Sequence, residues 1–193
     1  MKARAKAKQE TRQRLLETAK QEFIKKGLLK LSTVDVAKKA GVAHGTVFFH
    51  FQNKENLIVQ VLDTELLSIT AELNVLLYGP YDMETLLNRY LDFLEKEEEF
   101  FAVIARETPF YPPKLRRIIL GREAAIRAYF YQTLQDEIAQ GKCKEVDITT
   151  TLSFLFATLN YYLGLRDAFA TGQSVISDKR RVIVSTFIQL LSN

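Results

Sequence analysis

The sequence predicts an all-α protein, and three observations carry this prediction. Apolar residues recur every three or four positions along most of the 193 residues, which is the spacing of one helix face. Glycines and prolines fall between these periodic segments, where they end helices. No strand-like alternation of apolar and polar residues continues for more than a few positions. A chain of this length can bury a substantial core.

The first two predicted helices lie near the N-terminus. An apolar stripe with helical spacing begins after Thr11 and ends at Gly27, a residue type that commonly terminates helices. A shorter helix is expected over residues 33–40. Ser32 is placed to cap its N-terminus, and Asp35 completes a capping-box pattern with Asp in place of Glu.

The next two predicted helices follow after a brief turn. Residues 45–51 supply a third helix of about two turns. Asn53 then caps a long fourth helix, whose apolar stripe runs from Leu57 to Ile69. The Gly-Pro pair at residues 79–80 separates this helix from the rest of the chain.

The second half of the chain continues the helical pattern. Prolines at positions 109, 112 and 113 interrupt it between two helices. The acidic run over residues 95–99 is interpreted as a solvated helix end rather than a metal site, because nothing adjacent supplies further ligands. The predicted helices in this half cover residues 83–97, 100–106, 114–140, 147–170 and 178–191.

The charge of +4 is distributed unevenly along the chain. Residues 1–54 carry 13 lysines and arginines against 4 acids, a net charge of +9, whereas residues 55–193 carry 14 against 19, a net charge of −5. A basic head on an acidic body predicts that the head binds a polyanion. A lysine-rich tail that is merely solvated is the alternative.

Composition excludes several classes of protein. The single cysteine, Cys143, excludes an internal disulfide framework, and two histidines with one cysteine are too few for a structural zinc site. The N-terminus is too polar for a signal peptide. The longest apolar stretch, residues 149–165, is short of a membrane span and carries Thr, Ser and Asn. We therefore expect a soluble, cytoplasmic protein without a cofactor.

The second and third predicted helices have the lengths and the connecting turn of a helix-turn-helix. Small residues at Ala37 and Ala40 allow the two helices to pack closely, and the glycine of the 41–43 turn permits a tight reversal. Residues 44–46 are small or polar, so the start of the third helix is free to approach base edges.

A longer segment adds specificity to this motif. Residues 32–57 read STVDVAKKAGVAHGTVFFHFQNKENL and closely resemble the DNA-binding signature of the TetR family of transcriptional regulators. The resemblance extends through the first helix, over about residues 11–62. It implies a basic arm and three-helix DNA-binding domain over residues 1–54. An effector-binding and dimerisation domain of helices would follow over residues 55–193.

The resemblance also implies roles for single residues. Thr46 matches a threonine that hydrogen-bonds a DNA phosphate, and Lys54 matches a lysine that pairs with phosphate at a helix N-terminus. His50 matches a position that reaches phosphate, whereas His44 and Gly45 match variable positions that approach bases. The residues assigned to the DNA interface are Val34, Ala43, His44, Gly45, Thr46, Phe48, Phe49, His50 and Lys54.

Three of these residues depart from the family pattern. Ala43 replaces the usual Ser or Thr, so the recognition helix loses an N-cap that contributes ~1 kcal/mol. Phe48 replaces tyrosine and removes a phenol that normally bonds phosphate. Phe49 occupies an exposed position and could contact a thymine methyl group. Two alternatives stay open: Phe48 in the core, and His50 as an ordinary surface histidine.

Two further observations concern the function of the N-terminal segment. The basic arm at residues 1–8 could contact phosphates or the minor groove, or could be a solvated leader. A catalytic role for His44 or His50 is disfavoured, because no nucleophile with an orienting acid accompanies either histidine. The sequence therefore does not predict an enzyme.

The predicted second domain is rich in aromatic residues, so it could enclose an apolar effector cavity. Each aromatic residue could equally belong to the core. Arg122 and Arg127 could meet an anionic group or pair with Glu123 or Glu107. The candidate effector-binding residues are Phe101, Ile104, Phe110, Tyr111, Arg122, Tyr129, Phe154, Thr158 and Tyr161.

The last two helices, residues 147–170 and 178–191, are apolar on more than one face, which predicts a homodimer. The resemblance implies that they form a four-helix interface and that the dimer binds a palindromic double-stranded operator. We therefore expect a repressor that a small, largely apolar effector releases from DNA. The scarcity of histidine and cysteine favours an organic effector. A helical small-molecule carrier or adaptor without specific DNA binding is the alternative.

Overall fold

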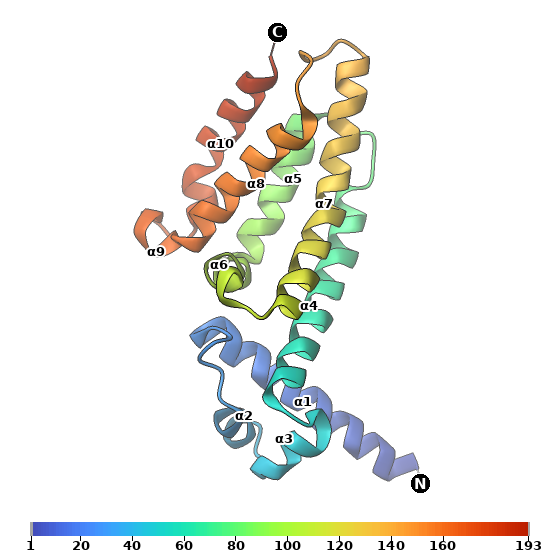
Figure 1. The fold of residues 1–193 in the computed structure, drawn as a ribbon, viewed down its shortest axis with the longest axis vertical. Coiled ribbons are helices and arrows are strands. Elements are labelled where there is room, and N and C mark those ends of the chain that lie inside the picture. The colour runs from blue at the N-terminus through green and yellow to red at the C-terminus, as the bar shows by residue number, and fades with distance from the viewer. Residues whose placement is uncertain (1, 193) are drawn as a thin grey trace. The chain divides into compact units, whose positions relative to one another are not determined.

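The computed structural model describes the backbone of residues 2–192 and the side chains of residues 4–192. The first residues of the predicted basic arm, including the side chain of Lys2, lie outside the described side chains. The described residues form helices and no strand, which confirms the predicted all-α fold. They divide into two compact units, one ending at Leu67 and one beginning at Ser68. The helices are α1 (Lys2–Lys26), α2 (Thr33–Lys39), α3 (His44–Phe51), α4 (Lys54–Leu77), α5 (Met83–Lys96), α6 (Glu98–Glu107), η1 (a 3-10 turn, Thr108–Phe110), α7 (Pro113–Ala139), α8 (Ile148–Gly164), α9 (Arg166–Phe169) and α10 (Val175–Leu191) (Figure 1).

The first helix is longer than its apolar stripe indicated. α1 begins at Lys2, well before the predicted start near Thr11, so the described part of the basic arm is helical. Residues 4–10 are exposed and carry no apolar stripe, yet they are Ala, Lys, Arg, Gln and Glu, which have high helix propensity. Propensity rather than burial extends the helix here. None of the described helices combines the length and apolarity needed to cross a lipid bilayer.

The N-terminal unit reaches past the boundary predicted after Lys54. Leu57 and Leu62, from the first turns of α4, are fully buried. Lys20 of α1 pairs with Glu65 of α4 at 2.6 Å. Because these turns of α4 pack and pair within the N-terminal unit, the unit continues to Leu67.

The buried carboxylate of Glu22 links α1 to α2 through ion pairs. Glu22 is 3% exposed and pairs with Lys26, one turn along α1, at 2.9 Å and with Lys39 of α2. Lys26 also bridges to Asp35 of α2 at 3.0 Å. Hydrogen bonds from Lys39 and Lys26 hold the pKa of Glu22 below its usual value. The two lysines therefore stabilise the ionised form of this carboxyl group.

Replacing Glu22 by glutamine is expected to lower the free energy of unfolding of this unit by about 2 kcal/mol at neutral pH. Because the folded pKa is depressed, the stabilisation is complete above the ordinary carboxyl pKa and is lost as the pH falls through the folded value. Urea unfolding of both proteins from neutral pH down to about pH 2 should show the difference shrinking. The exposed Glu17→Gln is the control, and a difference that persists at low pH would contradict the charge explanation.

The C-terminal unit is a stack of helices in which α6 packs closely on α8, and α10 packs on both α5 and α8 (Figure 1). The predicted helix over residues 147–170 is divided at Leu165 into α8 and α9. At this break a Cβ placed on Gly164 would lie 3.6 Å from the backbone of Ala105 in α6. Beyond the break Arg166 turns toward Glu98, with Nε 3.4 Å from Oε1.

Glu98 belongs to the acidic run that was expected to be solvated, but it is 5% exposed. Its two oxygens accept the backbone N–H groups of Val175 and Ile176, each at 3.1 Å, and the hydroxyl of Ser174. The carboxylate thus satisfies the first donors of α10 and complements the helix dipole. This contact begins α10 at Val175, earlier than the predicted residue 178.

Candidate functional site

The connection between α2 and α3 folds into a tight turn. The N–H of Gly41 donates to the carbonyl of Lys38 at 3.2 Å, and the N–H of Val42 donates to that of Ala37 at 3.0 Å. Gly41 has φ of 67°, in the left-handed region that glycine enters without strain. Ser32 caps α2 as expected, its hydroxyl accepting from the N–H of Asp35 at 3.3 Å. The predicted helix-turn-helix is therefore formed.

α3 buries one face and exposes the other. Val47 and Phe51 are buried in the N-terminal unit, with exposures of 0% and 1%. Phe48 is 41% exposed and Phe49 is 68% exposed. The structure thus favours the exposed alternative for Phe48. Two large aromatic rings are therefore exposed to solvent on one short helix, which makes this face a candidate contact surface.

The N-terminus of α3 has no side-chain cap. Ala43 occupies the N-cap position with extended backbone and makes no capping hydrogen bond. His44 instead contacts α2, because its Nε2 lies 3.0 Å from Oγ1 of Thr33. Its ring also meets the edge of Phe48 at 4.9 Å between centroids. The position of His44 therefore depends on α2 as well as on α3.

α1 adds positive charge beside the exposed face of α3. Nζ of Lys8 lies 4.9 Å from the centroid of the Phe49 ring, within cation–π range. The guanidinium of Arg12 lies 5.6 Å from the centroid of Phe51 and donates to the side chain of Gln60 in α4. The described part of the basic segment is thus attached to α3 by aromatic contacts.

His50 is half-buried and lies close enough to Lys8 and Arg12 for their charges to affect it. Its Nδ1 is buried without a hydrogen-bond partner. Burial, together with the positive charges of Lys8 and Arg12, lowers the pKa of His50 below its usual value. Without a bound anion these surroundings favour the neutral imidazole.

The nine residues predicted to contact DNA all retain access to solvent. Six are exposed, and Thr46, His50 and Lys54 are half-buried. Lys54 is in the first turn of α4, directly after Asn53, whose Oδ1 accepts the N–H of Asn56 at 2.8 Å. Val34 lies on α2 and is 55% exposed. The unit therefore presents side chains from α2, α3 and the start of α4.

The nine predicted effector residues do not gather in one cavity. Ile104 and Tyr111 are buried, and the hydroxyl of Tyr111 donates to Glu107 at 3.1 Å. Burial, assisted by the neighbouring Glu107, raises the pKa of Tyr111. Phe101 stacks edge-on against Phe100 and is half-buried. Arg122 is half-buried, and Phe110, Phe154, Thr158 and Tyr161 are exposed.

Arg127 was predicted either to meet an anionic group or to pair with a nearby glutamate, and the structure shows the pairing. Its Nε donates to Glu123, one turn away on α7, at 2.8 Å. Its guanidinium also lies 4.4 Å from the centroid of the Phe156 ring. These contacts join α7 to α8 and account for the charge of Arg127 without a ligand.

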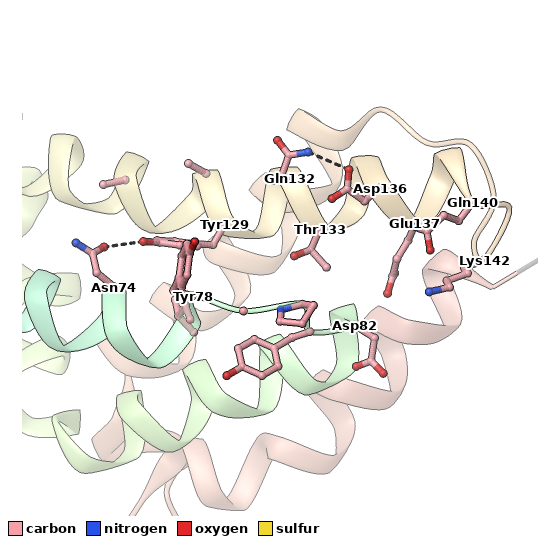
Figure 2. A pocket seen from close by; sticks show the side chains of 16 residues that line it. Asn74, Tyr78, Asp82, Tyr129, Gln132, Thr133, Asp136, Glu137, Gln140 and Lys142 are labelled. Atoms are coloured by element: carbon pink, nitrogen blue, oxygen red, sulfur yellow. Dashed lines mark hydrogen bonds between the residues drawn. The ribbon is translucent and has the colours of Figure 1, made fainter.

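A groove of about 1120 Å³ lies between α7 and the segment that leads from α4 into α5 (Figure 2). Tyr129, alone among the nine predicted residues, lines it, and its hydroxyl donates to Oδ1 of Asn74 at 3.0 Å. Across the groove, Oε1 of Glu137 accepts the N–H of Met83 at 2.9 Å. These two hydrogen bonds join α7 to α4 and to the start of α5.

Most residues of this groove were not predicted from the sequence. The Gly-Pro pair at residues 79–80 was predicted only to separate two helices, although residues 78–82 combine this pair with two tyrosines and an aspartate. Tyr78 is 79% exposed, an unusual state for an aromatic ring. Two tyrosines and one aspartate within five residues were the available signal.

A second groove, of about 200 Å³, runs between α8 and α10. Its walls are mainly apolar, and three of its side chains are largely open to solvent: Phe154 (62% exposed), Val182 (57%) and Leu190 (42%). Phe154 and Thr158, predicted to bind effector, line this groove instead. The second apolar face expected on the last helices is therefore present.

These features define a class: a helix-turn-helix protein with a second, wholly helical unit among its described residues. Residues 15–61 match the family described as "Bacterial regulatory proteins, tetR family". Residues 15–61 therefore form a DNA-binding segment of the TetR type. The resemblance seen in residues 32–57 is thereby confirmed.

Known relatives are similar mainly in the N-terminal unit. The chain is 39% identical over 56 residues to the HTH-type transcriptional regulator TtgR of Pseudomonas putida, a match covering 29% of this chain and only 27% of that protein. It is 23% identical to the HTH-type transcriptional regulator SrpR of Pseudomonas putida over 95% of this chain and 86% of that protein.

Solved structures extend the similarity of fold to nearly the whole chain. A putative transcriptional regulator from Saccharomonospora viridis in complex with choline has a TM-score of 0.78 at 19% identity, covering 94% of this chain and 96% of its own. The regulator FadR from Bacillus subtilis in complex with stearoyl-CoA has a TM-score of 0.74 at 16% identity, covering 91% and 97%. At these identities the likeness establishes the fold alone.

Proposed function

We propose that the protein is a cytoplasmic, DNA-binding transcriptional repressor that an organic effector releases from its operator. The observation that carries this proposal is the exposed face of α3, within the segment that matches the family. The rings of Phe48 and Phe49 lie open to solvent there, with Lys8 beside them. Aromatic contact surface next to basic side chains suits the bases and phosphates of a duplex.

Within this proposal, Thr46 and Lys54 hold phosphates and fix the register of α3. His44, Gly45 and Phe49 face base edges, with the Phe49 ring against a thymine methyl group. Val34, Ala43, Phe48 and His50 complete the contact surface. Lys8 and the described turns of α1 before it supply sequence-independent attraction to phosphates.

We propose that the effector binds the groove between α7 and the loop at residues 78–82. The volume of about 1120 Å³ is ample for a small organic molecule. The regulator similar in fold from Saccharomonospora viridis was solved with choline, and FadR from Bacillus subtilis with stearoyl-CoA. α4 carries Lys54 in its first turn and Asn74 near its end, so one helix contributes to both the DNA-facing and the effector-facing residues. An effector that weakens DNA binding is itself bound less tightly by the DNA-bound protein.

We propose a homodimer formed through the apolar groove between α8 and α10. Val182→Glu is expected to convert the dimer to monomer, because it places a charge on that face and leaves the monomer core unchanged. Gln189→Glu is the matched control, since it adds the same charge to a different side of α10, which lines a pocket together with Asn88 of α5. Light scattering coupled to size-exclusion chromatography measures the mass, and a dimeric Val182→Glu protein would refute the assignment.

The direct test is a mobility shift with DNA from upstream of the gene at increasing salt. A regulator that neutralises several phosphates loses affinity linearly in log–log form as salt rises, with a slope near −0.9 per phosphate. Absence of a sequence-specific shift, or an affinity indifferent to salt, would favour the alternative function of a helical carrier or adaptor. Enzymatic activity is not part of the proposal.

A further inference from the structure

The groove between α7 and the loop at residues 78–82 combines aromatic rings with carboxylates. Tyr78 and Tyr129 come from the two walls (Figure 2), and Tyr81 also lines the groove. A cation already rests on one of these rings, because the guanidinium of Arg89 lies 4.3 Å from the centroid of Tyr81. Ring faces attract cations through their quadrupole, so the walls suit positive charge.

Three carboxylates line the same groove, against one lysine. Asp82 accepts the N–H of Thr85 at 2.7 Å, Asp136 accepts the amide of Gln132 at 2.9 Å, and Glu137 accepts the N–H of Met83 at 2.9 Å. These are hydrogen bonds from neutral donors, and no ion pair in the described part of the chain engages any of the three carboxylates. Lys142 is the one cationic side chain among the lining residues.

Asp82 is charged at neutral pH, since the hydrogen bonds from Thr85 hold its pKa below the usual value. Figure 2 shows Glu137 pointing from α7 toward the loop that carries Asp82. The described carboxylates nevertheless do not converge closely enough to chelate a metal ion. The negative charge is spread along the walls, which suits a large and weakly hydrated cation better than a compact one.

We propose that the effector of this groove is an organic cation with an apolar body, such as a quaternary ammonium or phosphonium ion. This inference rests on the proposed function, in which the same groove receives the effector. Asp82 and Glu137 neutralise its charge, and the exposed ring of Tyr78 covers its apolar groups. The proposed effector is therefore charged, whereas a largely apolar effector was expected from the sequence.

Tetraphenylphosphonium and tetraphenylborate test the proposal, because the two ions share a shape and differ in the sign of their charge. Calorimetry with the full chain should show the phosphonium binding at least about tenfold more tightly than the borate. The double variant Asp82→Asn/Glu137→Gln keeps a hydrogen-bond acceptor at each position and removes both charges. It is expected to lose about tenfold in phosphonium affinity.

Two further variants locate the site. Tyr78→Ala, at a side chain that is 79% exposed and does not support the fold, should weaken phosphonium binding about threefold to tenfold. Glu99→Gln/Asp167→Asn removes two exposed charges of the same unit outside the groove and should leave the affinity unchanged. Equal affinity for the two ions, binding of neither, or the same loss in this control overturns the inference.

The mobility shift distinguishes failure of the cation inference from failure of the proposed function. If the protein shifts its upstream DNA but the phosphonium does not bind, the cation inference fails and the proposed regulator stands. If no specific shift occurs, the proposed function fails whatever the calorimetry shows. Release of the DNA by the phosphonium and not by the borate supports both.

Discussion

Joint replacement of Thr46 and Lys54 by alanine is expected to weaken binding to the operator about 100-fold. Each side chain is half-buried at a helix start, Thr46 in α3 and Lys54 in α4, where the proposal places a DNA phosphate. In the proposed complex the Lys54 contact is charge-assisted and the Thr46 hydroxyl adds a second bond, so together they would contribute about 3 kcal/mol. Because the proposal assigns both side chains to phosphates, the loss should be uniform across DNA sequences, and the salt slope should fall by about one.

Loss of DNA contacts in the double variant must be distinguished from unfolding of the N-terminal unit. Alanine is a good helix former, so α3 and α4 are expected to persist, and circular dichroism checks this. Lys25→Ala is a suitable control, because it removes one exposed lysine from the C-terminal end of α1, which lies away from α3 in the same unit (Figure 1). Binding that survives the double substitution, or that falls equally in the control, would remove both residues from the interface.

Replacing Glu98 by glutamine is expected to destabilise the C-terminal unit by about 3 kcal/mol. The carboxylate accepts two backbone N–H groups at the start of α10 and pairs with Arg166. An amide can accept one of these bonds, but its NH₂ group faces donors, so at least one buried N–H is left without an acceptor. Arg166 also loses its charge partner in a largely buried position.

Hydrogen exchange localises the effect. The amides near the start of α10 should lose protection in Glu98→Gln before those of α7, since the contact holds α10 and α9. The neighbouring Glu99→Gln is the matched control, because Glu99 is exposed and its loss should change stability by less than about 0.5 kcal/mol. Equal urea midpoints for the two variants would show that the buried carboxylate contributes little.

Helices were predicted where an apolar stripe marks them and were misjudged at their ends. The start of α1 carries no stripe, because residues 4–10 bury nothing. The start of α10 depends on Glu98, which lies 77 residues before Val175. Contacts of that separation leave no periodic signal in the sequence, so Ser174, which caps α10, was not recognised as its N-cap.

The two candidate sites differ in how far apart their residues lie in the sequence. The residues proposed to contact DNA lie close together in sequence, so a local motif was enough to propose them. The groove joins residues near Asn74 to residues near Glu137, and the hydrogen bonds of Tyr129 to Asn74 and of Glu137 to Met83 link these distant segments. Aromatic content pointed to the unit that contains the groove but selected mostly core and surface residues.

The sequence alone determined the helical class, the helix-turn-helix and the second apolar face of the last helices. All three follow from hydrogen bonding and burial repeated every turn, and spacing records such local patterns. The tertiary structure decided where a cavity opens, which carboxylates are buried and which charges face the groove. Those properties depend on packing between distant segments, as the burial of Glu22 and Glu98 shows, and no local pattern encodes them.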